Sequence, residues 1–273
     1  MREFEQIVCE RGSRSGAAMA IAVHSTRLGP ALGGARMWHY SSSEAAIADA
    51  MRLGEAMTLK AAVAGLELGG GKGVLATPNP QAPTGELRRA MLEDFGDLVE
   101  SLEGAYITAE DVGTSPVDME VIAERTAHVV GRDRATGGSG DPSPVTALGV
   151  LAAIRACASA RWPGRGRDLG GLRVCVVGLG HVGSNLLARL ATEGAELLAS
   201  DIDPAKRAAA EGLGAEWLEP ADALRARCDV LAPCALGGAI TSELTAELRA
   251  GVICGAANNI LADRSLAGEL RRA

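Results

Sequence analysis

The stretch Arg173-Val-Cys-Val-Val-Gly-Leu-Gly-His-Val-Gly183 decides the fold of the second half of the chain. A short apolar run, typical of a buried strand, leads directly into a Gly-x-Gly-x-x-Gly sequence and then into a helical pattern. In this context the glycines let the backbone approach a pyrophosphate at the N-terminus of a helix. We therefore interpret the stretch as a dinucleotide-binding loop and not as a tight structural turn alone.

An acidic residue, Asp201, stands 18 residues past Gly183, where the next strand is expected to end. A carboxylate in this place accepts hydrogen bonds from the adenosine ribose, and its charge opposes a 2′-phosphate. We therefore expect NAD, in preference to NADP, as the cofactor. The residues expected to bind it here are Gly178, Leu179, Gly180, His181, Val182, Gly183 and Asp201.

From residue 172 onward, strand-like and helix-like segments alternate. Apolar runs predict strands at 173–177, 196–200, 229–232 and 252–255. Helical spacing predicts helices at 182–193, 204–212 and 242–249. This alternation is typical of a parallel sheet with crossover helices.

The first half also mixes the two kinds of element. Strand-like runs occur at 18–24, 73–76 and 105–108. Helical patterns cover 86–102, 116–127 and a segment that the capping box Ser41-x-x-Glu44 opens. Turn-forming residues at 137–144 then precede a helix at 145–160. The predicted fold is α/β with two domains, 1–136 and 137–273, the second of Rossmann type.

Composition excludes several classes of partner. The net charge is −7 and the cations form no stripe, which argues against nucleic acid. Apolar runs such as 17–23 fall far short of a membrane span, and the N-terminus shows no signal peptide, so we expect a cytoplasmic protein without membrane contact. The six cysteines form no CxxC pair, which favours reduced thiols and no metal site.

Lysine is rare, with only Lys60, Lys72 and Lys206 among 27 basic residues of the Lys and Arg types. Arginine serves at nearly all positions where a positive charge suffices. The few lysines are therefore expected at positions that need a compact ammonium group or one that can lose its proton. Lys60 and Lys72 lie in one Gly/Ala-rich stretch, which we expect to form a loop of the substrate domain. A phosphate-binding P-loop is excluded at Gly69–Lys72, because Leu66 and Gly73 occupy positions that need Gly and Ser or Thr.

Seven motifs together resemble the Glu/Leu/Phe/Val dehydrogenase family, most closely its leucine and valine dehydrogenases. In chain order they are Leu28–Trp38, Met57–Lys60, Gly69–Lys72, Tyr106–Gly113, Gly138–Ala147, Pro233–Gly237 and Gly255–Asn259. The similarity runs from about Phe4 to the end of the chain. It implies an NAD-dependent, homo-oligomeric enzyme that converts an amino acid to a 2-oxo acid and ammonia, with a substrate-binding and dimerisation domain first.

The resemblance also implies individual roles. Lys72 would be the catalytic lysine that activates water, and Asp111 would accept a proton from the substrate amine. Lys60 would bind the substrate carboxylate, assisted by the backbone of Gly33 and Gly34. The resemblance further places Thr146, Ala235 and Asn258 at the nicotinamide side of the cofactor, with Asn258 also near the substrate.

The resemblance implies that Leu32 and Ala109 line the substrate side-chain pocket, and Met57 is also expected to bind the substrate. Glutamate-type relatives place a cation at the position of Leu32, where it meets a side-chain carboxylate. An apolar Leu leaves such a charge unpaired, which opposes glutamate as substrate. The small Ala109 favours branched aliphatic chains over large aromatic ones. We therefore expect leucine, valine or isoleucine.

Two other interpretations stay open at this point. Relatives usually continue beyond Asn259 with another strand and returning helices, so the chain is expected to be C-terminally shortened. A catalytically impaired NAD-binding remnant, or an assembly partner of such an enzyme, is therefore the main alternative. A two-domain enzyme acting on hydroxy acids has less support, since no Arg-plus-His pairing suited to that chemistry stands out.

Overall fold

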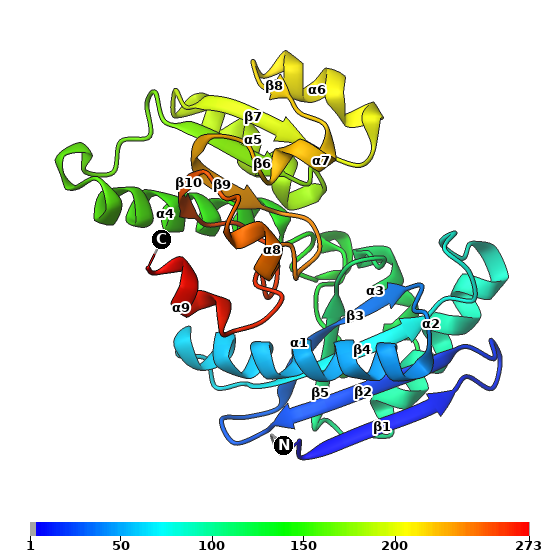
Figure 1. Cartoon of the computed structure of the whole chain (residues 1–273). Coiled ribbons are helices and arrows are strands. Elements are labelled where there is room, and N and C mark those ends of the chain that lie inside the picture. Colours follow the sequence, from blue (N-terminus) through cyan, green and yellow to red (C-terminus); the bar gives the residue numbers. More distant parts are fainter. Residues whose placement is uncertain (1–3, 273) are drawn as a thin grey trace. The chain divides into compact units, whose positions relative to one another are not determined.

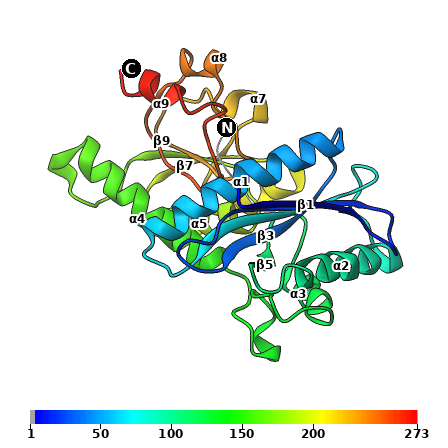
Figure 2. The same cartoon turned by 90° about the horizontal axis from the view of Figure 1, so that it is seen from below.

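The computed structural model describes residues 4–272 and divides into two compact units, Met1–Asp141 and Pro142–Ala273. Each unit has its own sheet and its own hydrophobic core. Figures 1 and 2 show these two sheets with their helices.

The first unit is built on a mixed five-stranded sheet in the order β1-β2-β4-β3-β5. Its strands are β1 (Gln6–Arg11), β2 (Ala18–Ser25), β3 (Ala31–Trp38), β4 (Gly69–Ala76) and β5 (Tyr106–Glu110). The strands β3, β4 and β5 run parallel, whereas β2 is antiparallel to both β1 and β4. The parallel strands therefore share one carboxyl edge.

Helices cover both faces of this sheet (Figure 2). They are α1 (Ser43–Val63), α2 (Gly85–Glu100) and α3 (Pro116–Ala123), followed by a 3-10 turn at Arg134–Thr136. Helix α1 packs so closely on one face that a Cβ on Gly70 would lie 2.0 Å from the Thr58 nitrogen. On the other face, a Cβ on Gly73 would lie 2.3 Å from the Phe95 ring of α2.

Several predictions for the first unit need correction. Ser42, not Ser41, is the N-cap of α1, because its side chain accepts a hydrogen bond from the Ala45 nitrogen. Strands β1 and β3 were not predicted, and β4 begins at Gly69 and not at residue 73. Lys72 therefore lies within a strand and Lys60 within a helix, so the expected lysine-bearing loop is wrong.

The second unit has a parallel five-stranded sheet in the order β10-β9-β6-β7-β8, which confirms the predicted α/β class. Its strands are β6 (Arg173–Val177), β7 (Glu196–Ser200), β8 (Glu216–Trp217), β9 (Cys228–Pro233) and β10 (Ala250–Ile253). Its helices are α4 (Ser143–Arg161), α5 (His181–Thr192), α6 (Arg207–Gly212), α7 (Pro220–Ala223), α8 (Ser242–Thr245) and α9 (Leu266–Leu270), with 3-10 turns at Pro163–Arg165 and Pro204–Lys206.

Helix α4 is, by length and composition alone, apolar enough to cross a membrane, which the expectation from apolar runs did not foresee. Much of its apolar character comes from alanine. Ala147, Leu151, Ile154 and Ala158 are buried in the core together with residues of β6 and α5. One side of the helix therefore contributes to the core of the α/β unit.

Candidate functional site

One face of the first sheet gathers five of the predicted site residues. Leu32 pairs with Gly70 and Ile107, and Gly34 pairs with Ala109. Because side chains alternate along a strand, this register places the following residues on the face that α1 covers: Leu32, Gly34, Lys72, Ala109 and Asp111. Gly33 belongs to the opposite face.

Lys72 and Asp111 form a buried ion pair, with Lys72 Nζ 2.9 Å from Asp111 Oδ2. Only 4% of the lysine side chain and 15% of the aspartate side chain are exposed. Arg36, on β3, donates from Nε to the same oxygen at 2.8 Å. Asp111 Oδ2 therefore contacts two cationic side chains, which belong to the neighbouring strands β3 and β4.

The ion pair extends into a larger charged cluster that sequence reasoning did not identify. Arg36 Nη1 donates to Asp49 Oδ2 at 3.0 Å, and Tyr40 donates its hydroxyl to the same oxygen at 2.9 Å. Arg36 was quoted only as part of a motif, and nothing distinguished it among many arginines. Asp49, in α1, carried no sequence signal beyond a polar position in a helix. We call Arg36, Tyr40, Asp49, Lys72 and Asp111 the charged cluster.

Two glycines of β3 allow this close packing. A Cβ on Gly34 would lie 2.5 Å from the Glu110 carbonyl oxygen and 2.8 Å from the Asp111 Cβ. A Cβ on Gly33 would lie 1.8 Å from the Gly71 carbonyl oxygen, and the Gly33 carbonyl also accepts a hydrogen bond from the buried Tyr106 hydroxyl. The Gly-Gly pair therefore lets Asp111 and the Lys72 backbone approach β3.

The cluster shifts the proton affinities of both partners of the ion pair. Burial lowers the pKa of Lys72, and the opposing attraction of Asp111 does not cancel this effect. Burial alone would raise the pKa of Asp111, but Lys72 and Arg36 hold it below its usual range. An ionised carboxylate thus lies beside an amine that gives up its proton more easily than an exposed lysine does.

The neighbouring residue Glu110 behaves differently. Burial, followed by the charges of Asp141, Asp111 and Asp118, raises its pKa to about 7. Its register partner is Ala35, so it belongs to the face opposite Asp111. Glu110 therefore adds a titrating carboxyl group behind the charged cluster and not within it.

The second oxygen of Asp111 is available for further bonding. Both cations contact Oδ2, and no hydrogen bond to Oδ1 occurs within residues 4–272. The backbone beside it is fixed, because Thr114 Oγ1 accepts from the Asp111 nitrogen at 2.9 Å and donates to the Ala35 carbonyl at 2.9 Å. The carboxylate is thus held in place with one oxygen unused.

The two remaining predicted substrate residues, Met57 and Lys60, belong to helix α1 and not to the sheet. Met57 and Lys60 both lie in the C-terminal part of α1, near Thr58, which touches Gly70. The Lys60 side chain is exposed and forms no ion pair with any other described residue. The structure therefore shows no ion pair between Lys60 and the charged cluster.

The predicted cofactor loop lies at the carboxyl end of β6. Gly178 has φ +97° and abuts Ala235, and a Cβ on Gly183 would lie 1.9 Å from the Gly178 carbonyl oxygen. Asp201 follows β7 and accepts from the Leu179 nitrogen through Oδ2 at 2.5 Å and from the Asp203 nitrogen through Oδ1 at 2.8 Å. The carboxylate is thereby fixed beside the loop.

This geometry fits a dinucleotide. A Cβ on Gly180 would meet no atom within 4 Å, and His181 and Val182 then open α5, whose N-cap Gly180 has no side chain to cap it. The first turn of α5 therefore has backbone N–H groups in an open place suited to a pyrophosphate. No group of three or more His, Cys, Asp or Glu side chains suited to a metal ion was found within residues 4–272.

The remaining cofactor candidates belong to the same unit. Thr146 lies exposed in the first turn of α4. Ala235 and Asn258 are also exposed, in segments that follow β9 and β10. These two segments are joined, since the Ala257 nitrogen donates to the Pro233 carbonyl at 2.9 Å and the Gly238 nitrogen donates to the Asn259 carbonyl at 2.8 Å.

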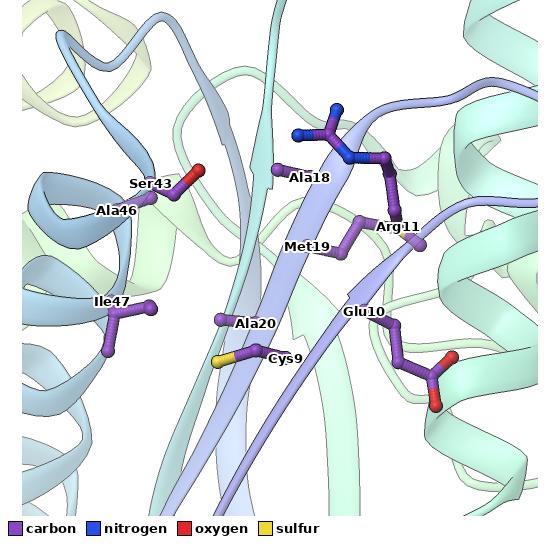
Figure 3. A pocket seen from close by; sticks show the side chains of 9 residues that line it. All are labelled: Cys9, Glu10, Arg11, Ala18, Met19, Ala20, Ser43, Ala46 and Ile47. Atoms are coloured by element: carbon purple, nitrogen blue, oxygen red, sulfur yellow. The ribbon is translucent and has the colours of Figure 1, made fainter.

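Two cavities of the first unit lie away from the ion pair. One, of about 200 Å³, lies between β1, β2 and the start of α1 and is lined by Cys9, Arg11, Ser43 and Ile47 among others (Figure 3). The other, of about 280 Å³, is lined by Tyr40 but by neither Lys72 nor Asp111. Neither cavity contains the predicted substrate residues.

Comparison with known families gives two matches. The profile of the Glu/Leu/Phe/Val dehydrogenase dimerisation domain matches residues 6–128. The profile of the D-isomer specific 2-hydroxyacid dehydrogenase NAD-binding domain matches residues 149–249. The second match confirms the expected NAD-binding fold of the second unit.

Individual relatives cover nearly the whole chain. Leucine dehydrogenase of Bacillus subtilis is 46% identical over 261 residues, which are 95% of this chain and 70% of that protein. Valine dehydrogenase of Streptomyces virginiae is 40% identical, over 94% of this chain and 72% of its own length. The crystal structure of L-tryptophan dehydrogenase from Nostoc punctiforme matches with a TM-score of 0.71 and 37% identity, over 98% of this chain and 75% of that one.

Proposed function

Because this chain belongs to the Glu/Leu/Phe/Val dehydrogenase family, we propose that it oxidatively deaminates a branched-chain aliphatic L-amino acid with NAD. The products are the 2-oxo acid, ammonia and NADH, and the reaction is reversible. The observation that carries the proposal is the buried contact of 2.9 Å between Lys72 Nζ and Asp111 Oδ2. The amine chemistry of this reaction needs both a base and an acid, which this pair supplies.

Asp111 takes the first proton. The substrate arrives with a protonated amine, and hydride can leave its Cα only after that nitrogen has a free electron pair. Asp111 stays ionised at neutral pH because Lys72 and Arg36 lower its pKa. Its second oxygen, Oδ1, accepts the proton from the amine while Oδ2 remains bound to the two cations.

Lys72 acts in the hydrolytic half of the reaction. Burial lowers its pKa, so that Nζ can exist as a neutral amine that removes a proton from water. The water oxygen then bonds to the imine carbon. The resulting ammonium form of Lys72 stabilises the new hydroxyl group. Asp111 then returns its proton to the nitrogen, and its carboxylate takes up the hydroxyl proton as the C=O bond forms, the C–N bond breaks and ammonia leaves.

The second unit supplies the redox partner. NAD, when bound, accepts the hydride from the substrate Cα. Gly178–Gly183 would hold its pyrophosphate and Asp201 its adenosine ribose. Thr146, Ala235 and Asn258 would contact the nicotinamide side, as the family resemblance implies.

Substrate choice rests on the first sheet and on α1. Lys60 would hold the α-carboxylate, with the backbone of Gly33 and Gly34. Leu32, Met57 and Ala109 would contact the side chain, and Leu32 disfavours a distal carboxylate because it leaves the charge without a partner. We also propose that the enzyme is a homo-oligomer, since its first unit matches a dimerisation domain.

The deciding experiment is NADH oxidation with ammonia and a panel of 2-oxo acids. We expect 4-methyl-2-oxopentanoate or its valine- and isoleucine-derived analogues to give the highest kcat/KM. Fastest turnover of 2-oxoglutarate would contradict the Leu32 argument, and fastest turnover of indole-3-pyruvate would liken the substrate choice to that of the L-tryptophan dehydrogenase relative. Bound NAD without ammonia-dependent turnover of any 2-oxo acid would favour the alternative of a non-catalytic remnant.

A further inference from the structure

Two cysteine side chains of the second unit are in contact, although they lie far apart in the sequence. Helix α4, which carries Cys157, packs on β10, and Cys254 comes directly after that strand, so that the two thiols interact. Both residues are partly exposed. The contact is supported by packing, because Cys254 borders the core cluster that contains Ile154 and Ala158 of the same helix.

These thiols lie next to segments that the proposed function uses. Cys254 is fixed by a hydrogen bond of 2.9 Å from its nitrogen to the Leu231 carbonyl, and the segment 255–259 follows it. That segment contains Asn258. Cys157 lies in α4, the helix whose first turn carries Thr146. A covalent bond between the sulfurs would join two elements that are expected to contact the cofactor.

We propose that Cys157 and Cys254 form a redox-modification site, at which a peroxide converts the thiol pair into an intrachain disulfide. The peroxide first oxidises one thiol to a sulfenic acid and is itself reduced to water. The sulfur of the other thiol then attacks that sulfur, the S–S bond forms, and the sulfenic oxygen leaves as water. The two sulfurs together lose two electrons, which the peroxide accepts.

The chain contains a matched control pair. Cys175 and Cys228 also neighbour one another, but they are 0% and 6% exposed. Burial raises the pKa of Cys175 to about 12 and that of Cys228 to about 11. Both pairs consist of interacting thiols, but an oxidant has less access to the buried pair. We expect the control pair to stay reduced under conditions that oxidise Cys157 and Cys254.

The environment also sets the expected rate. Burial, followed by the charge of Cys157, raises the pKa of Cys254 to about 12. The reacting species is the thiolate, and its population rises about tenfold per pH unit below the pKa. We therefore expect slow disulfide formation at pH 7 and clearly faster formation at pH 9.

Peptide mapping tests the site without any measurement of activity. The full chain is treated with hydrogen peroxide, its free thiols are blocked without reduction, and it is digested with trypsin. Cleavage after arginine gives peptides 156–161 and 250–264, which contain Cys157 and Cys254 as their only cysteines. We expect these two peptides to be linked, with a mass about 2 Da below their sum, and to separate on reduction.

The variants Cys157→Ser and Cys254→Ser should each abolish the linked peptide, whereas Cys175→Ser should not. No linked peptide at pH 9 would overturn the proposal. So would linkage of 250–264 to the peptide that contains Cys234, another thiol close to Cys254. Irreversible oxidation of Cys157 without a linkage would overturn it as well.

The functional consequence rests on the proposed function. The two sulfurs must approach to about 2 Å in a disulfide, which moves segment 255–259 relative to α4. We expect the oxidised protein to show a several-fold higher KM for NAD, reversed by a thiol reductant and absent in Cys157→Ser. An unchanged KM in fully linked protein would refute the effect on the cofactor. Lack of turnover in reduced protein would instead count against the proposed function, and the peptide map would be unaffected.

Discussion

Arg36 Nε lies 2.8 Å from Asp111 Oδ2, the same oxygen that Lys72 contacts. Arg36 also bonds to Asp49, so its guanidinium joins β3 to α1 and to the residue that follows β5. A planar guanidinium presents its donors in fixed directions, so it holds both carboxylates more rigidly than a lysine ammonium does. The arginine therefore fixes the position and the charge state of Asp111.

Replacement of Arg36 should shift the pH dependence of the reaction. The positive charge of Arg36 lowers the pKa of Asp111 and also that of Lys72. Without that charge both pKa values rise, so the ionised carboxylate and the neutral amine both require a higher pH. In Arg36→Leu the acid limb of the kcat/KM profile should move to higher pH, with a loss of about 10- to 100-fold at pH 7.

Arg36→Lys is the control for this effect. It keeps the charge but not the rigid fork of donors, so its profile should lie between those of the wild type and Arg36→Leu. An Arg36→Leu profile with the same midpoint as the wild type, and merely lower throughout, would indicate a structural role alone.

Gly34→Ala should damage the site through sterics. The added Cβ would lie 2.5 Å from the Glu110 carbonyl oxygen, a backbone atom that cannot rotate away. We expect the free energy of unfolding to fall by about 1–3 kcal/mol and kcat/KM to fall as β5 and Asp111 shift. Gly149→Ala is the control, because its Cβ meets nothing within 4 Å on an exposed turn of α4. Equal denaturation midpoints for the two variants would contradict the packing argument.

Asp201→Ala should weaken the preference for NAD over NADP. Its carboxylate would repel a 2′-phosphate, so its removal should raise the kcat/KM ratio of NADP to NAD by about 10- to 100-fold. NAD binding should also weaken, because Asp201 holds the Leu179 nitrogen. Asp203→Ala provides the comparison, since Asp203 caps the turn at Pro204–Lys206 through the Ala205 nitrogen. Its cofactor ratio should stay near that of the wild type.

Asp94 should stabilise the first unit in a pH-dependent way. Its buried carboxylate accepts from the backbone nitrogens of Arg14 and Ser15 and pairs with the Arg14 side chain. Burial would raise its pKa, but the hydrogen bond from the Ser15 hydroxyl, together with those from the Ser15 nitrogen and from Arg14, holds it below its usual value. The stabilisation is therefore present above the unfolded-state pKa of about 4 and is lost as pH falls through the folded-state value.

In Asp94→Asn we accordingly expect a lower Tm at pH 7, equivalent to about 1–3 kcal/mol. The difference from the wild type should shrink as the pH is lowered below about 4. A difference in Tm that does not change with pH would show that the carboxylate charge is not the cause.

The second unit was more predictable from sequence than the first. Strands β6 and β7 have the predicted bounds, because each is an apolar run that ends at a loop or an acidic residue. Strand β3 was missed, since Leu32-Gly-Gly-Ala35 has little strand propensity and is held in the sheet by its neighbours. Its glycines are needed for the close approach of Asp111, a relation between distant segments that no local pattern contains.

Rarity also decided which site residues could be found. Lys72 was conspicuous as one of three lysines, although the Gly-rich sequence suggested a loop where the structure has a strand. Arg36 was hidden among many arginines, and its importance lies in the two carboxylates that it joins. Composition therefore pointed to Lys72, but it did not point to Arg36, which fixes the position of Asp111.

The central claim, that Lys72 and Asp111 act as one unit on the substrate amine, is tested most directly by a double-mutant cycle of kcat/KM. Lys72→Met and Asp111→Asn are measured singly and together for deamination of L-leucine, with NAD affinity measured separately by binding. We expect each single variant to lose about 10³-fold and the double variant to lose little more, with NAD affinity unchanged. Losses that multiply, or a single variant that retains activity within about threefold, would contradict the claim.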